Sequence, residues 1–227
     1  MTVVLPPPRT VPLLAVRQLT RIEDGEELRA LLWSAGPGWR MISSTVVGGG
    51  IGERSWVLNA QVSHGYRRMD PDRHLAEVAG AVSAHGGGVG MMTAADVSAY
   101  AHARDEGVET VATAGVTVRG WAASPAEGTP PPTEPGTINI IAALPVALSD
   151  AALVNAVATA TEAKVQALLE AGYDCSGTPT DAVCIAARAP RPGKEVHAFA
   201  GPRSVWGARL ARAVHRAVHE AVPAPER

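Results

Sequence analysis

The stretch that most constrains the fold is residues 136–189, in the C-terminal half of a 227-residue chain. It begins with residues 136–141 (GTINII), a run rich in β-branched residues that predicts a buried strand. Ser149 is a typical helix N-cap residue, and the sequence after it predicts a helix that ends near Gly172. A polar turn then leads into a second apolar run, residues 182–189, which predicts another strand. The stretch is therefore expected to form a strand–helix–strand unit.

The predicted helix carries polar side chains at positions that decide its chemistry. At about 100° per residue, one face of the helix gathers its larger apolar residues, which are Leu153, Val154, Val157, Val165 and Leu168. Thr161 falls near the middle of that face, Lys164 lies beside it, and Glu162 lies on its flank. A buried lysine ammonium needs an acidic partner, a solvated cleft or a lowered pKa, unless the stem packs while the ammonium reaches solvent. Both interpretations of Lys164 stay open at this point.

Composition restricts the class of protein. With 46% hydrophobic residues the chain can bury a substantial core, and with only 4% aromatic residues it must fill that core with alanine, valine and leucine. The formal net charge of −2 gives no electrostatic footprint for nucleic acid or for an acidic membrane. No apolar run approaches the roughly 18 residues of a membrane-spanning helix. We therefore expect a globular protein whose partner is a small molecule, with homo-oligomerisation left open.

The N-terminus and the two cysteines indicate a cellular compartment. The N-terminus has no basic segment before an apolar block, so no signal peptide is expected. Cys175 and Cys184 show no CxxC pattern, and Cys184 lies in an apolar run typical of a buried thiol. These features predict a reducing, cytoplasmic environment.

The whole chain predicts one domain, residues 13–222, after a proline-rich lead-in at residues 1–12. Further strands are expected at residues 13–19, 28–33, 39–47, 55–62, 89–93 and 108–118, and further helices after Asp70 and near Ser204. Residues 119–135 are rich in proline and are expected to form a flexible loop around Trp121. This order predicts an α+β fold, in which a mixed or mainly antiparallel sheet is packed by a few helices. A four-layer αββα sandwich would satisfy the same order.

One polar residue lies inside an apolar strand, and a few small or polar residues lie at the ends of strands. Asn59 interrupts an apolar strand, and the alternatives for it are a solvated face or a bulge. Thr93, Thr113 and Gly115 are predicted at strand ends. Small residues there could offer backbone donors to a carbonyl oxygen, or they could be ordinary strand-end residues.

Three motifs of the central stretch resemble a known family. They are GTINII at residues 136–141, TEAK at residues 161–164 and SGTPTDAV at residues 176–183, and the likeness extends over most of residues 40–221. With these motifs the chain resembles the adenosylcobinamide amidohydrolases, the corrinoid-salvage enzymes called CbiZ. The resemblance implies hydrolysis of the amide that links aminopropanol to the corrin ring, which yields adenosylcobyric acid and 1-amino-2-propanol. The alternatives are a corrinoid-binding protein without hydrolysis, or an amidohydrolase of another substrate.

The resemblance also implies that the corrinoid is the substrate and that the protein supplies no cofactor and no metal. His215 and His219 have the spacing of a helical metal pair, but they lie opposite the apolar face of their helix and lack an evident third ligand. Two features depart from the family pattern. Pro179 stands where the family usually has glycine, and the loop around Trp121 is unlike the usual loop rich in asparagine and alanine.

Amide hydrolysis needs an attacking group, donors for the oxyanion and a proton for the leaving amine. In one route, a neutral Lys164 activates the hydroxyl of Thr161 one helical turn away. In the route that we favour, Glu162 or Asp181 is the general base for water, and Lys164 stabilises the developing negative charge. The catalytic candidates are thus Thr161, Glu162, Lys164 and Asp181. The substrate-binding candidates that the resemblance adds are Ser43, Asn59, Thr93, Thr113, Gly115, Asn139, Thr178, Thr180 and His197.

Overall fold

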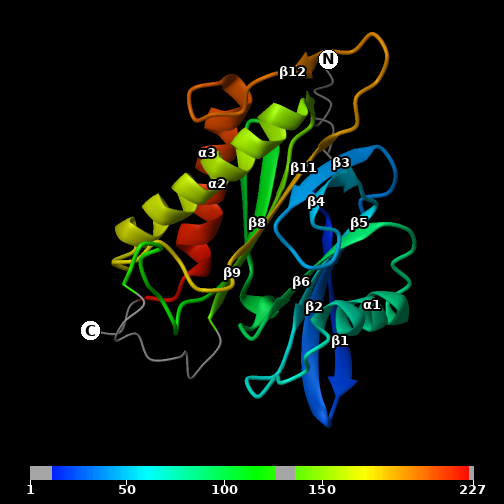
Figure 1. The fold of residues 1–227 in the computed structure, drawn as a ribbon, viewed down its shortest axis with the longest axis vertical. Coiled ribbons are helices and arrows are strands. Elements are labelled where there is room, and N and C mark those ends of the chain that lie inside the picture. The colour runs from blue at the N-terminus through cyan, green and yellow to red at the C-terminus, as the bar shows by residue number, and fades with distance from the viewer. Residues whose placement is uncertain (1–11, 126–135, 225–227) are drawn as a thin grey trace, which may run out of the picture.

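The computed structural model describes residues 12–125 and 136–224, whose path is shown in Figure 1. All but the last residue of the expected lead-in, and residues 126–135 of the expected loop, lie outside the described residues. In the described part, the chain forms two main β-sheets, a two-stranded ladder and three α-helices. None of the helices in these ranges has both the length and the apolar content needed to cross a membrane.

The N-terminal part of the chain builds a four-stranded sheet. Its order is β1-β2-β5-β6, and its strands are β1 (Val16–Glu23), β2 (Glu26–Trp33), β5 (Trp56–Gln61) and β6 (Gly88–Thr93). The hairpin of β1 and β2 turns at Asp24 and Gly25, which both have positive φ angles, as a type I′ turn requires. Strands β5 and β6 run parallel, and helix α1 (Pro71–Ala81) connects them.

The predicted strand–helix–strand unit forms the middle of a six-stranded sheet with the order β4-β3-β11-β9-β8-β7. Its strands are β3 (Trp39–Ser43), β4 (Gly50–Glu53), β7 (Ala101–Asp105), β8 (Val108–Gly115), β9 (Thr137–Ala143) and β11 (Ala182–Arg188). Strands β9 and β11 pair in parallel with helix α2 (Asp150–Glu170) as the crossover, whereas the other pairs in this sheet are antiparallel. The short elements are the 3₁₀ turn Val97–Ala99 and the parallel pair β10 (Ala147–Leu148) and β12 (Val196–His197).

The secondary structure forms four layers, and a hydrophobic cluster packs between each pair of adjacent layers. The first lies between the six-stranded sheet and helices α2 and α3 (Val205–Ala221), the second between the two sheets, and the third between the four-stranded sheet and α1. On β9, Ile138 and Ile140 belong to the first cluster and Ile141 to the second, as strand alternation requires. Figure 1 shows α2 and α3 on one side of the sheets and α1 on the other. The α+β class with mixed, mainly antiparallel sheets is confirmed, in the four-layer arrangement of the αββα alternative.

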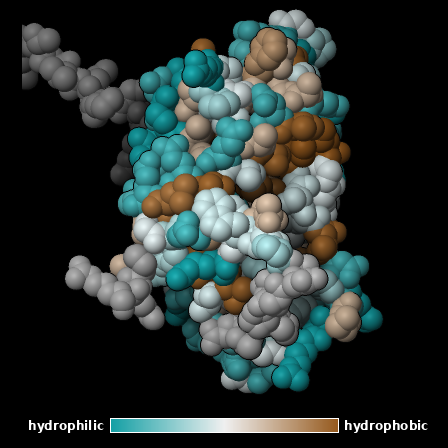
Figure 2. Space-filling view, turned by 60° about the vertical axis from the view of Figure 1, so that its left-hand side comes forward, coloured by the Kyte–Doolittle hydropathy of each residue, from teal (hydrophilic) through white to brown (hydrophobic). Residues whose placement is uncertain are grey.

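Helix α2 is buried mainly through alanine, together with two of its leucines, Leu153 and Leu168. The buried alanines are Ala152, Ala156, Ala160, Ala163 and Ala167. Val154 is 58% exposed and Leu169 is 46% exposed, and Figure 2 shows hydrophobic residues scattered among hydrophilic ones on the side where α2 and α3 lie. Small side chains let α2 approach α3 and the sheet closely. Of the predicted face, Leu153 and Leu168 are buried as expected, whereas Val154 and Thr161 are exposed.

Candidate active site

Lys164 is a buried lysine with an acidic partner. Only 7% of the residue is exposed, and its ammonium donates a hydrogen bond to Asp181 Oδ2 in an ion pair between α2 and the start of β11. Of the two interpretations left open by the sequence, the structure therefore supports the partner and not a lysine that reaches solvent. A buried pair of this kind is costly to form, and it is tolerated where further hydrogen bonds satisfy both charges.

The carboxylate of Asp181 is surrounded by donors. Its Oδ1 accepts from the backbone N–H of Ile138 at 2.9 Å and lies 2.5 Å from the hydroxyl of Thr178. Its Oδ2 accepts from the Lys164 ammonium and from the backbone N–H of Thr178 at 3.2 Å. An ionised carboxylate has about four acceptor positions, so Asp181 is close to its capacity. Its environment suits a residue that holds and orients Lys164.

The polar turn that precedes β11 is held against the start of β9. The Thr178 hydroxyl lies 2.8 Å from the carbonyl oxygen of Gly136, and that of Thr180 lies 2.6 Å from Thr137 Oγ1. Gly177 has a φ of +146°, and a Cβ at this position would collide with Asp181 Oδ2 and the Lys164 ammonium. Only glycine therefore allows the turn to approach the ion pair so closely.

A cavity of about 630 Å³ opens beside the ion pair. Its wall includes Lys164, Asp181, Thr161, Thr178 and Trp121. The indole of Trp121 is 44% exposed, so an aromatic surface stands in the same cavity as a fixed ammonium. This combination can bind a ligand that has a large apolar face and a polar group to be polarised.

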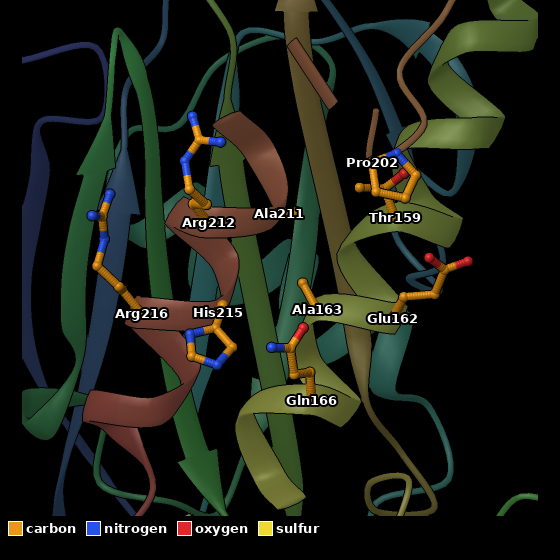
Figure 3. Close-up of a pocket in the computed structure, with 9 residues that line it drawn as sticks. All are labelled: Thr159, Glu162, Ala163, Gln166, Pro202, Ala211, Arg212, His215 and Arg216. Carbon is orange, nitrogen blue, oxygen red and sulfur yellow. The ribbon is translucent and has the colours of Figure 1, made fainter. Parts of the chain in front are cut away.

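Thr161 does not lie on the buried face where the helical wheel placed it, whereas Glu162 lies off that face as predicted. Thr161 lines the cavity, but its hydroxyl donates to the carbonyl oxygen of Val157 at 2.9 Å. Glu162 lies elsewhere on α2 and lines a groove of about 350 Å³ between α2 and α3, and Figure 3 shows its carboxylate pointing away from His215. Glu162 is not among the residues that line the cavity beside Lys164, so its catalytic role stays a prediction.

Three of the predicted substrate-binding residues form a buried polar network between the sheets. Asn59 donates to Thr113 Oγ1 at 2.9 Å, and Asn139 donates to Asn59 Oδ1 at 2.8 Å and to the carbonyl oxygen of Met92 at 2.9 Å. Asn139 Oδ1 has no hydrogen-bond partner among the described residues. None of the three lines the 630 Å³ cavity. Their hydrogen bonds join the two sheets, and their predicted role in substrate contact stays a prediction.

Four other predicted binding residues also lie away from the cavity wall. Thr93 Oγ1 accepts a hydrogen bond from Ala95 N at 3.0 Å, and Ala95 lies next to Gly115. Ser43 Oγ donates a hydrogen bond to the carbonyl oxygen of Val183 at 3.0 Å. His197 contacts the first residues of α2, since its carbonyl oxygen accepts from the N-cap residue Ser149. Lys164 lies fifteen residues after Ser149, which at a rise of 1.5 Å per residue is about 22 Å further along the helix. His197 is therefore remote from the site, and its ring instead accepts from Trp206 Nε1 at 3.1 Å.

The two cysteines are poor nucleophiles. Both are free and fully buried, and burial raises the pKa of the Cys175 thiol and raises that of Cys184 to about 12.

Among the described residues, no three His, Cys, Asp or Glu side chains gather closely enough to hold a metal ion. His215 bonds to Glu170 at 2.8 Å and stacks on His219 with ring centroids 6.0 Å apart.

The fold and the cavity define an α+β protein with a small-molecule site, in which a buried lysine–aspartate pair meets an aromatic surface. A family model described as adenosylcobinamide amidohydrolase (CbiZ) matches residues 15–226. The chain belongs to this family, and the expected membership is confirmed. The family name describes an amidohydrolase, a class of hydrolytic enzyme.

Two relatives bear the name adenosylcobinamide amidohydrolase. The protein from Methanosarcina mazei is 30% identical over 182 residues, which cover 77% of this chain and 86% of the relative. The protein from Halobacterium salinarum is 45% identical over 85 residues, or 37% of this chain and 35% of the relative. The solved structure of the PH0078 protein from Pyrococcus horikoshii matches this chain with a TM-score of 0.46 at 14% sequence identity. The match covers 93% of this chain and 83% of the PH0078 chain.

Proposed function

We propose that this protein hydrolyses adenosylcobinamide at the amide that links aminopropanol to a propionate arm of the corrin ring. Water adds to the amide carbonyl, the C–N bond breaks, and the products are adenosylcobyric acid and 1-amino-2-propanol. Family membership supports the proposal. The structural observation that carries it is the ion pair of Lys164 and Asp181 at the wall of a cavity large enough for an arm of such a substrate.

In this proposal, Lys164 stabilises the negative charge that develops on the carbonyl oxygen. An ammonium has three N–H donors, and Asp181 accepts only one of them. Since the group is buried and already oriented by Asp181, it needs little reorganisation when the tetrahedral intermediate forms. Such a fixed donor contributes roughly 10²–10³ to the rate of acyl transfer.

Water is the attacking group in the proposal, because the protein hydroxyls and thiols are poorly placed. The Thr161 hydroxyl donates to Val157, and the cysteine thiols are buried. Asp181 can serve as the base for this water when the Thr178 hydroxyl, which also lies 2.8 Å from the carbonyl oxygen of Gly136, donates to that oxygen and frees Asp181 Oδ1. Asp181 then takes a proton from the water and passes it to the leaving amine nitrogen, while Lys164 stays in place.

A second candidate function, corrinoid binding without hydrolysis, is supported by the crowding of donors around Asp181. If no donor moves on binding, the cavity holds a ligand but lacks a base. Incubating the purified protein with adenosylcobinamide separates the two functions. Hydrolysis yields adenosylcobyric acid in a chromatogram, whereas simple binding retains intact adenosylcobinamide in equilibrium dialysis.

We further propose that hydrolysis needs no protein-bound metal, since the Lys164 ammonium already supplies a positive charge in the cavity and would repel a second cation. The corrinoid is then the substrate and not a resident cofactor. A reducing, cytoplasmic compartment is part of the same proposal, because it would keep Cys175 and Cys184 as the free thiols that the structure contains.

A further inference from the structure

Residues 119–122, which we call the Trp121 segment, are fastened to the turn that leads to the ion pair. Gly120 N donates to the carbonyl oxygen of Gly177 at 3.1 Å, and Ser176 N donates to the carbonyl oxygen of Gly120 at 3.0 Å. These two bonds make a short antiparallel bridge between residues 120 and 177. The described start of the expected flexible loop is thus anchored by backbone hydrogen bonds.

The side chain of Ser176 adds two bonds to this bridge, on either side of the tryptophan. Its hydroxyl oxygen accepts from Ala122 N at 2.8 Å and donates to the carbonyl oxygen of Gly120 at 3.2 Å. The guanidinium of Arg119 lies over the ring of Tyr173 at 5.1 Å, which is a third attachment. The backbone of Trp121 is therefore held at both of its neighbours.

The indole itself stays 44% exposed and lines the cavity next to Lys164. A large exposed indole is costly in water unless a ligand covers it, and flat apolar rings stack well on such a surface. When the backbone beneath the ring is already fixed, binding does not have to order it, so more of the stacking energy appears as affinity.

We propose that Ser176 is a positioning residue that holds Trp121 as a preformed platform for the apolar face of a planar macrocycle, and thereby sets the affinity for the substrate. The inference rests on the proposed function, because it takes the ligand to be a corrinoid. The hydroxyl of Ser176 is the group that matters, since it bonds to both backbone neighbours of Trp121.

The test is a double-mutant cycle with Ser176→Ala, Trp121→Ala and the double variant. The affinity for adenosylcobinamide is measured by equilibrium dialysis with the coloured corrinoid, and KM and kcat by product chromatography. A side-chain hydrogen bond contributes about 0.5–1.5 kcal/mol net, which corresponds to about a 2- to 10-fold rise in Kd and KM for Ser176→Ala. We expect kcat to stay within about 2-fold. In the Trp121→Ala background, Ser176→Ala should change Kd no further, because its effect passes through the indole.

Two further variants separate positioning from loss of stability. Ser176→Thr keeps the hydroxyl and should keep the wild-type Kd. Ser55→Ala is the matched control, because the Ser55 hydroxyl also contacts the backbone at two places, 3.1 Å from the carbonyl oxygen of His85 and 3.0 Å from that of Gly87, but outside the cavity. It should lower the midpoint of urea unfolding and leave Kd unchanged.

The outcomes distinguish this inference from the proposed function. Equal effects of Ser176→Ala with and without Trp121, or a loss confined to kcat, would overturn the positioning role. If the wild-type protein binds adenosylcobinamide with the predicted coupling but forms no product, the inference stands and the hydrolytic function fails. If the wild-type protein does not bind the corrinoid at all, both are wrong.

Discussion

The Lys164→Met variant removes one charge from the ion pair and keeps the apolar stem that packs in α2. Asp181 then loses one donor and keeps those of Ile138 N, Thr178 N and the Thr178 hydroxyl. Breaking a buried pair typically costs roughly 3–5 kcal/mol, because a charge is left without partners. Since three donors remain here, we expect a loss of about 1–3 kcal/mol in the free energy of unfolding. Urea unfolding followed by circular dichroism measures this change.

The same variant should lose much more activity than stability. Removing a fixed donor to the oxyanion costs about 2.7–4 kcal/mol in the barrier, or about 10²–10³ in kcat. The rate of adenosylcobyric acid formation is measured well below the unfolding midpoint of both proteins. Lys194→Met is the matched control, because Lys194 is the other lysine of the chain and is exposed. If Lys164→Met retains turnover within a few-fold of the wild type, the assignment of Lys164 is refuted.

Three more predictions follow from the placement of the site residues. Glu162→Gln should keep kcat within about 3-fold in the same assay, because Glu162 lines the groove between α2 and α3; a 100-fold loss would return it to the catalytic centre. Gly177→Ala should abolish turnover and cost about 1–3 kcal/mol in stability, whereas Gly193→Ala, also at positive φ but with nothing near its Cβ, should keep full activity. EDTA treatment should leave the rate unchanged, and a loss restored by one divalent ion would contradict the proposed role of the Lys164 ammonium.

The central unit of the fold could be predicted because its signals are local. Residues 136–141 and 182–189 match β9 and β11 closely, and the Ser149 hydroxyl caps α2 by accepting from Ala152 N at 3.2 Å. Strands β4 and β7 are not among the strands that the sequence predicted. Glycine carries no side-chain pattern, and the pairing of β4 with β3 defines it as a strand. Contacts of this kind are set by the tertiary structure and leave little trace in the sequence.

The candidate site was predictable only in part. Lys164 and Asp181 come from two motifs that the sequence places at the ends of one crossover, and the structure brings them together. A wheel weighted by leucine and valine identified Leu153 and Leu168 but not the five alanines of the buried face, so it placed Thr161 on that face, whereas Thr161 is exposed. The polar network around Asn59 joins two sheets, and no local pattern shows that two strands face each other across a core.

The measurement that tests the central claim most directly is hydrolysis of adenosylcobinamide in water labelled with heavy oxygen. The purified wild-type protein and the Lys164→Met variant are incubated with the corrinoid, and the products are identified by mass spectrometry. Our account predicts adenosylcobyric acid that carries one labelled oxygen in its new carboxylate, together with unlabelled 1-amino-2-propanol, at a rate that falls about 10²–10³ in the variant. Intact adenosylcobinamide after prolonged incubation with the wild-type protein, or cleavage that is unaffected by Lys164→Met, would contradict it.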